Sequence, residues 1–88
     1  MAKVEIYTSP FCGFCHSAKK LLQVKGVAYE EIDTFTTPGA RDEMVERSNG
    51  HHTVPQIFID GEHVGGCREL YALDHAGGLD AKLEKVSS

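Results

Sequence analysis

The hydrophobic period changes once near the N-terminus, and this change restricts the fold more than any other feature of the sequence. Residues 3–8 alternate with a period of two, which places Val4 and Ile6 on one face of an expected strand. Between Gly13 and Gly26 the apolar residues recur instead at helical spacing. They are Phe14, Ala18, Leu21 and Leu22. The pattern therefore predicts a strand, a short loop and a helix with these four residues on one stripe.

Turn and capping signals divide the rest of the chain into further elements. Thr37-Pro38 supplies an N-cap residue and a proline for a second helix, which Asn49-Gly50 ends. Asp60-Gly61 is a tight-turn signal, so the strands on either side of it should form a hairpin. After the first strand and helix, the expected strands are 27–33, 55–60 and a short one at His63-Val64. The expected second helix is 38–48 and the third runs from Cys67 to Gly77, followed by one or two helical turns from Leu79 to Leu83.

The order of these elements predicts the fold class. Strand, helix, strand, helix, two strands and a final helical segment indicate an α/β protein with a thioredoxin-like fold. Its four-stranded mixed sheet would carry helices on both faces, and parallel first and second strands would be joined by a right-handed crossover. A chain of 88 residues is long enough for one core, so we expect a single domain over residues 1–88. The loop before the first helix should lie at the carboxyl edge of the strands.

Composition excludes several classes of function. A net charge of -4 and a pI near 5.6 argue against a nucleic-acid partner, which requires clustered Lys and Arg. No apolar run approaches the roughly 18 residues that a membrane span needs, and the N-terminus carries no signal-peptide pattern. We therefore expect a cytoplasmic monomer without a membrane partner. Structural disulfides are rare in such a reducing compartment, so the cysteines are candidates for chemistry.

Cys12 and Cys15 stand at the expected start of the first helix. The unsatisfied N–H groups and the positive dipole of a helix start favour an anion there, and the thiolate is the nucleophilic form of cysteine. We expect Cys12 to be the exposed nucleophile. Cys15 lies one turn into the helix on the side of Ala18, so we expect it to be shielded and to act as the resolving thiol.

From the residues alone, other interpretations of these cysteines stay open. Together with His16 the motif matches a haem attachment signal, although haem attachment normally requires export. The pair could also be two incidental buried cysteines. A zinc site would need about four ligands; the remaining candidates are His51, His52, His63 and His75. Cys67 is alone after Gly65-Gly66 and is more typical of a packing residue than of a nucleophile, so its backbone N–H matters more than its thiol.

Three blocks of sequence narrow these alternatives. They are Val4-Glu5-Ile6-Tyr7-Thr8 leading to Cys12-Gly13-Phe14-Cys15, then Thr53-Val54-Pro55-Gln56-Ile57-Phe58-Ile59, then Val64-Gly65-Gly66-Cys67. In order and spacing they resemble the glutaredoxin family over nearly the whole chain, and most of all its short bacterial members with two active-site cysteines. The second and third blocks are similar to the glutathione-binding pattern of that family.

The resemblance implies a glutathione-dependent thiol-disulfide oxidoreductase. Such an enzyme reduces glutathione mixed disulfides and protein disulfides, with glutathione as co-substrate, without a metal and without a tightly bound cofactor. Its partners would be glutathione and glutathionylated or disulfide-bonded client proteins. Cys12 would attack the glutathione sulfur of a mixed disulfide, and Cys15 would close an intramolecular disulfide on the route for protein disulfides.

The resemblance also implies where glutathione binds. The peptide bond before Pro55 would be cis, and the backbone of Val54 would pair with the cysteinyl part of glutathione like an added strand. Thr53 and Phe14 would line the groove. The amides at the start of the third helix would hold the γ-glutamyl carboxylate; they belong to Gly66, Cys67 and Arg68.

At three places the sequence departs from the family pattern. Gly13-Phe14 stands between the cysteines where Pro-Tyr is common, and Ser9 replaces a lysine found in many members. Arg68 stands where an acidic residue is usual. Gly-Phe is typical of monothiol iron-sulfur carriers, although those have serine in place of Cys15.

Two other functions are compatible with the motifs. One is a glutathione-assisted [2Fe-2S] binding module, in which Cys12 thiolates of two chains share a cluster. Gly13 and Phe14 favour this alternative, whereas Cys15 and the absence of the extra loop and tryptophan of monothiol carriers disfavour it. The other is an electron donor coupled to a thioredoxin-like reductase, which the Thr53-Val54-Pro55 and Gly65-Gly66-Cys67 blocks disfavour.

Overall fold

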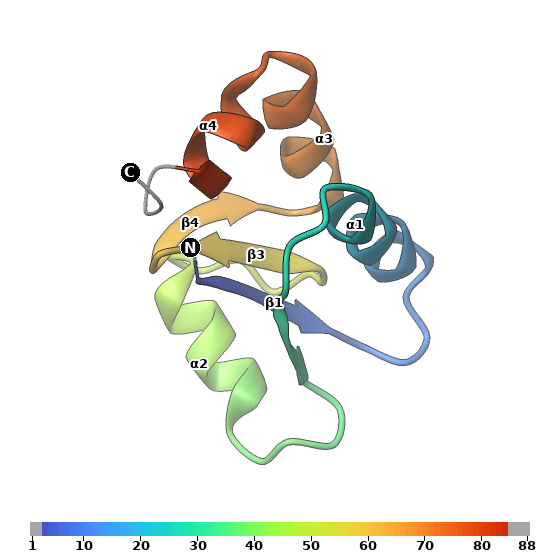
Figure 1. Ribbon diagram of the computed structural model, residues 1–88. Coiled ribbons are helices and arrows are strands. Elements are labelled where there is room, and N and C mark those ends of the chain that lie inside the picture. Colours follow the sequence, from blue (N-terminus) through green and yellow to red (C-terminus); the bar gives the residue numbers. More distant parts are fainter. Residues whose placement is uncertain (1–2, 85–88) are drawn as a thin grey trace.

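The computed structural model describes residues 3–84, which form strands and helices in the expected order (Figure 1). The elements are β1 (Val4–Thr8), α1 (Gly13–Val24), β2 (Glu30–Asp33), α2 (Ala40–Arg47), β3 (Gln56–Ile59), β4 (Glu62–Gly65), α3 (Cys67–His75) and α4 (Gly78–Glu84). None of the helices in this part of the chain has the length and hydropathy needed to cross a membrane.

The strands form one mixed sheet in the order β2-β1-β3-β4. β1 pairs in parallel with β2, whereas β3 runs antiparallel to both β1 and β4. Between β3 and β4, Asp60 and Gly61 both have positive φ angles, of 53° and 80°, as a tight two-residue hairpin turn requires. The expected four-stranded mixed α/β sheet and its hairpin are therefore confirmed.

Helices cover both faces of this sheet (Figure 1). On one face the core is formed by β1 and β3 together with α1, α3 and α4; its buried residues are Val4, Ile6, Ala18, Leu21, Leu22, Ile57, Ile59, Leu70, Leu79 and Leu83. On the other face, Met44 of α2 packs with Tyr7 and Phe58. Because β3 lies between two cores, all of its residues are buried, as its continuous apolar run predicts. The site-bearing loops thus emerge from a sheet that is fixed from both sides.

The expected start of the second helix is wrong. α2 begins at Ala40, and Thr37-Pro38 lies in the turn before it, where the Thr37 carbonyl accepts the N–H of Ala40. The N-cap residue is Gly39, whose φ angle of 78° is left-handed. Glycine takes this left-handed conformation at little cost, whereas a helix starting at Pro38 would require a right-handed conformation at residue 39. β2 is also shorter than expected, since it begins at Glu30 and not at residue 27.

The expected apolar stripe of the first helix is wrong in one residue. Phe14 is 71% exposed, and the buried residues of α1 are Cys15, Ala18, Leu21 and Leu22. The reason is helical spacing, because the core-facing row at the start of the helix passes through residues 15, 18 and 22, one position away from residue 14. Cys15 occupies the core-facing position in its place.

Candidate active site

Cys12 joins β1 to α1 and caps that helix with its own side chain. Its backbone is extended, with φ and ψ angles of -110° and 110°, and its Sγ accepts the N–H of Cys15 at 3.2 Å. The thiol also donates toward the Val54 carbonyl oxygen, 3.4 Å away. The first turn of α1 contains no acidic residue. The sulfur is therefore the group that occupies the anion-favouring end of this helix.

Cys15 is shielded from solvent at the opposite end of the motif. Its side chain is only 2% exposed, and burial, followed by the hydrogen bond with Cys12, raises the pKa of its thiol to about 12. At neutral pH Cys15 is therefore protonated, whereas Cys12 is half-buried and accessible. This difference gives the two thiols different chemistry although they stand three residues apart.

A groove of about 630 Å³ lies beside the two cysteines, within the roughly 300–1,000 Å³ typical of small-molecule sites. It brings together the loop before β3, the start of α3 and the exposed Phe14 ring. Its lining residues are Phe14, Thr53, Val54, Pro55, Gly66, Cys67, Arg68, Glu69 and Tyr71. All the glutathione-contacting residues expected from the sequence thus line one groove, and the Val54-Pro55 bond is cis as the resemblance implies.

Close packing between the loop before β3 and the start of α3 explains the two glycines. A Cβ atom on Gly66 would lie 3.2 Å from the Pro55 carbonyl oxygen. At Gly65, where φ is 124°, a Cβ atom would lie 2.8 Å from the Cβ of Glu69. A side chain at Gly65 would clash with Glu69, and one at Gly66 would crowd the Pro55 carbonyl oxygen, which favours glycine at both positions.

One of the amides expected to hold a ligand carboxylate already has an acceptor. The N–H of Gly66 donates to Glu69 Oε1 at 2.8 Å, so that Glu69 caps the start of α3. The N–H groups of Cys67 and Arg68, in the first turn, have no acceptor within the helix itself. A ligand anion at this helix start would therefore be held by Cys67 and Arg68, with Gly66 shaping the wall.

Glu69 and Tyr71 also line the groove, in addition to the seven residues expected from the sequence to contact glutathione. The position of Glu69 three residues after a helix N-cap is a capping signal that could have placed its carboxylate at the helix start. Tyr71 carried no such signal, because its place depends on a contact between helices. Its hydroxyl donates to the Ser17 carbonyl oxygen at 3.0 Å and so ties α3 to α1.

The thiol of Cys67 lies in the groove but in the protonated form. It is half-buried, and its pKa is raised first by burial and then by the neighbouring Cys12. A protonated thiol is a poor nucleophile, which favours the interpretation of Cys67 as a packing residue.

Two histidines take part in contacts that stabilise the loop before β3, which carries Thr53 of the groove. The rings of His51 and His63 have centroids 5.2 Å apart, and His63 Nε2 lies 2.7 Å from Gln56 Oε1. The amide nitrogen of Gln56 in turn donates to the Thr53 carbonyl oxygen at 3.0 Å. This chain of contacts fixes the loop before β3. Across residues 3–84, no three His, Cys, Asp or Glu side chains lie close enough to hold a metal ion together.

Comparisons with known proteins agree with this geometry. A protein-family model described as Glutaredoxin matches residues 4–64. Glutaredoxin 3 of Escherichia coli (strain K12) is 55% identical over 84 residues, which cover 96% of this chain and 100% of that protein. A probable glutaredoxin of Synechocystis sp. is 50% identical over 82 residues, or 93% of each chain.

Solved structures give the same result. The solution structure of a glutaredoxin from Brucella melitensis superposes with a TM-score of 0.79 at 53% identity, covering 92% of this chain and 87% of the other. The crystal structure of a buckwheat glutaredoxin-glutathione complex superposes with a TM-score of 0.87 at 26% identity, covering 96% and 78%.

Proposed function

Because the chain belongs to the glutaredoxin family of glutathione-dependent thiol-disulfide oxidoreductases and has its thioredoxin-like fold, we propose that Cys12 is the nucleophile and that glutathione binds in the adjoining groove. The observation that carries this proposal is the position of the Cys12 sulfur. It caps α1, receives the N–H of Cys15 at 3.2 Å and adjoins Val54 of the groove.

For a glutathione mixed disulfide we propose a route through one cysteine. The Cys12 thiolate attacks the glutathione sulfur, so that a Cys12–glutathione disulfide forms and the client leaves as a thiolate, which takes a proton from water. A second glutathione, as its thiolate, then attacks the sulfur of the bound glutathione. This step releases oxidised glutathione and returns the Cys12 thiolate. Sulfur chemistry alone completes the cycle, so the reaction needs no tightly bound cofactor.

For a protein disulfide we propose that Cys15 resolves the intermediate. Cys12 attacks one client sulfur and expels the other, after which the Cys15 thiolate attacks Cys12 and expels the first client sulfur. Two glutathione molecules then reduce the Cys12–Cys15 disulfide and leave as oxidised glutathione. Once Cys12 is part of a neutral disulfide, its contribution to the raised pKa of Cys15 is lost, which favours deprotonation of Cys15 at the step that needs it.

In the groove, the backbone of Val54 is proposed to pair with the cysteinyl unit of glutathione and to aim its sulfur at Cys12. The N–H groups of Cys67 and Arg68 would hold the γ-glutamyl carboxylate at the start of α3. The neighbouring ammonium needs an anion, and Glu69 supplies the carboxylate that lines this part of the groove. Thr53 and Pro55 complete the wall opposite Gly66, and Phe14 lies at its rim. The buckwheat relative was solved as a glutathione complex, which supports glutathione as the ligand.

A second candidate function is glutathione-assisted binding of a [2Fe-2S] cluster. The Gly13-Phe14 pair and the accessible Cys12 thiol favour this function. Because Cys15 is buried, Cys12 is the one cysteine of the pair that could bind a cluster beside the groove. The remaining ligands would then come from a second chain and from glutathione. Visible absorption of the anaerobically purified protein tests this alternative, because a bound cluster is coloured.

The enzyme proposal is tested by steady-state assay of the purified protein. The substrate is the mixed disulfide of glutathione with 2-mercaptoethanol, and formation of oxidised glutathione is followed as the glutathione concentration is varied. We expect turnover that requires glutathione and that a thioredoxin-type reductase cannot support in its place. Turnover that does not depend on glutathione would contradict the proposal.

A further inference from the structure

Two phenylalanine rings stand in solvent on the loops that follow β1 and β2, and one of them belongs to the residue before Cys12. Phe11 is 84% exposed and Phe35 is 70% exposed, yet their ring centroids are only 5.8 Å apart, in an edge-to-face arrangement with an interplanar angle of 83°. Phe11 precedes Cys12 in the loop after β1, and Phe35 lies in the loop after β2. These two residues, called the aromatic pair below, form an exposed apolar surface that the fold itself does not bury.

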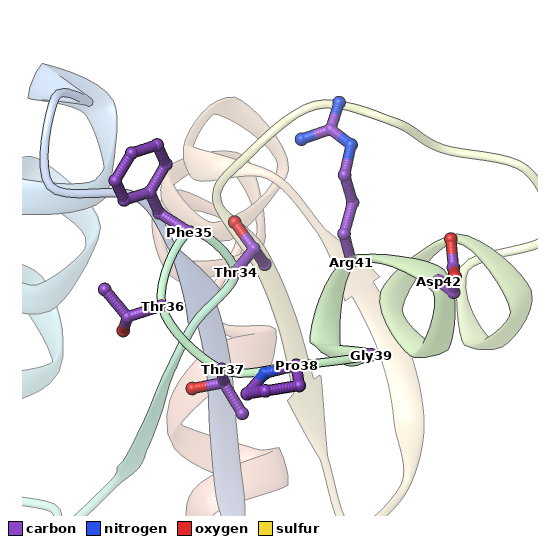
Figure 2. Close-up of a pocket in the computed structure, with 8 residues that line it drawn as sticks. All are labelled: Thr34, Phe35, Thr36, Thr37, Pro38, Gly39, Arg41 and Asp42. Atoms are coloured by element: carbon purple, nitrogen blue, oxygen red, sulfur yellow. The ribbon is translucent and has the colours of Figure 1, made fainter.

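The loop that carries Phe35 is held by three hydrogen bonds, which involve backbone and side-chain groups. The backbone N–H and the hydroxyl of Thr34 both donate to the Thr8 carbonyl oxygen, at 2.8 and 2.9 Å, which joins the ends of β1 and β2. The N–H of Phe35 donates to Asp33 Oδ1 at 2.8 Å. Figure 2 shows the Phe35 ring extending from this loop beside a hollow that Thr34 and Arg41 also border. The Phe35 ring is therefore presented to solvent by an ordered backbone.

The aromatic pair is separate from the glutathione groove. Neither Phe11 nor Phe35 lines the groove, and the hollow beside Phe35 shares no residue with it. Both surfaces nevertheless adjoin Cys12, since Phe11 precedes it and the groove residue Phe14 follows it in the same motif. Cys12 is thus linked to the aromatic pair through the chain neighbour Phe11 and to the groove through its contact with Val54.

We propose that the aromatic pair binds an apolar side chain of the client polypeptide, close in sequence to the client's reacting cysteine. This inference rests on the proposed function. A disulfide joins sulfurs only about 2.05 Å apart, so the client chain must pass close to Cys12 during exchange. The aromatic pair includes the residue before Cys12 and lies outside the groove, so it stays available to the client while glutathione is bound, and aromatic rings favour apolar and aromatic partners.

The size of the aromatic pair favours a transient client over a second copy of this chain. Two phenylalanines together bury at most roughly 500 Å². A stable dimer interface buries roughly 1,200–2,000 Å², whereas transient contacts are smaller. A contact of this size can select among clients and still release the product after each turnover.

The test compares two short peptides, each with one glutathionylated cysteine. One peptide has leucine and phenylalanine beside the cysteine, and the other has serine at both places. For the unmodified protein we expect kcat/KM to be about tenfold higher for the apolar peptide, the discrimination available to a small apolar contact. Phe35→Ser should bring the ratio of the two kcat/KM values close to one, and Phe35→Leu should retain most of the preference.

Val24→Ser is the matched control, because Val24 is also an exposed apolar residue, 75% exposed, and lies at the far end of α1. It should leave the preference unchanged. Equal kcat/KM values for the two peptides in the unmodified protein, or a preference that survives Phe35→Ser, would overturn the inference. Dimerisation that Phe35→Ser abolishes would overturn it as well, since a second copy would then be the occupant.

An assay with the mixed disulfide of glutathione with 2-mercaptoethanol distinguishes failure of this inference from failure of the proposed function. Unmodified protein that does not turn over this small substrate would overturn the proposed function and the client surface together. Turnover of the small substrate without a peptide preference would overturn the aromatic pair alone.

Discussion

Two helices begin beside the same groove with a cysteine at or near the first turn, but different groups occupy the two helix starts. At α1 the Cys12 sulfur accepts the N–H of Cys15, and no acidic residue lies in the first turn. At α3 a carboxylate is already present, because Glu69 accepts the N–H of Gly66. Cys67 is the first residue of α3 and is protonated.

The difference shows that a cysteine near a helix start is not by itself a nucleophile. The sulfur must be the group that receives the helix N–H bonds, as at α1, where a thiolate gains from the helix dipole. At α3 the sulfur only lines the groove, and the helix end is proposed to anchor a charged ligand. The four predictions that follow test this division of roles, beginning with the largest expected effect.

Replacing the sulfur of Cys12 should remove the activity. Cys12→Ser is expected to lower kcat/KM for glutathione mixed disulfides by at least about a thousandfold, because a serine hydroxyl is not ionised at neutral pH. Serine is also a preferred N-cap residue, so α1 should stay folded. Cys15→Ser should retain much of this activity and lose the reduction of protein disulfides. The measurements are steady-state kinetics on both substrate classes and circular dichroism.

Cys67→Ser is the matched control at the other helix start, and it should retain most of the activity. Comparable losses in Cys67→Ser and Cys12→Ser would remove the contrast between α1 and α3.

The burial of Cys15 should make the reduced protein less stable at alkaline pH. The folded-state pKa of about 12 lies above the ordinary value of 9.0, so the unfolded chain loses this proton first. The free energy of unfolding should therefore be unaffected below pH 9 and then decrease by up to about 1.4 kcal/mol per pH unit between pH 9 and 12. Denaturant unfolding of the reduced protein and of Cys15→Ala measures the difference, and parallel curves would contradict the prediction.

Removing the carboxylate at the start of α3 should have a smaller effect. Glu69→Ala is expected to lower the free energy of unfolding by about 1 kcal/mol, because the N–H of Gly66 loses its acceptor. Glu69→Gln keeps an oxygen acceptor and should cost less, since glutamine also serves at this capping position. Both variants should raise the KM for glutathione, because the γ-glutamyl ammonium loses its anion.

Thermal unfolding and glutathione-dependence kinetics measure the two Glu69 effects separately. Glu46→Gln, at an exposed carboxylate of α2, serves as the control for lost charge. If Glu69→Gln lowered the KM, Glu69 would be a competitor of the ligand carboxylate and not a partner of its ammonium.

The smallest effect is expected at Arg68, an exposed residue of the groove rim. Arg68→Asp should lower the KM for glutathione by no more than roughly fivefold, because exposed charge pairs contribute little, and kcat should hardly change. The effect should shrink as salt is added. Glutathione-dependence kinetics at low and high salt measure it. A severalfold weaker binding in Arg68→Asp would instead make Arg68 an anchor for the carboxylate.

The sequence by itself determined the order and type of the elements, because these depend on local patterns. The change of period at Gly13, the turn at Asp60-Gly61 and the apolar run of β3 each have a short-range physical cause. Similarity in order and spacing to a known family then located the groove. Thr53-Val54-Pro55 and Gly66-Cys67-Arg68 do line it together.

The tertiary structure decided which groups of those residues are free to act. Gly39 takes a left-handed conformation before α2, and Cys15, not Phe14, faces the core at the start of α1. The N–H of Gly66 is held by Glu69, and Phe11 meets Phe35 across two loops. Contacts between segments distant in sequence are set by the packing of the whole chain, and no local pattern encodes them.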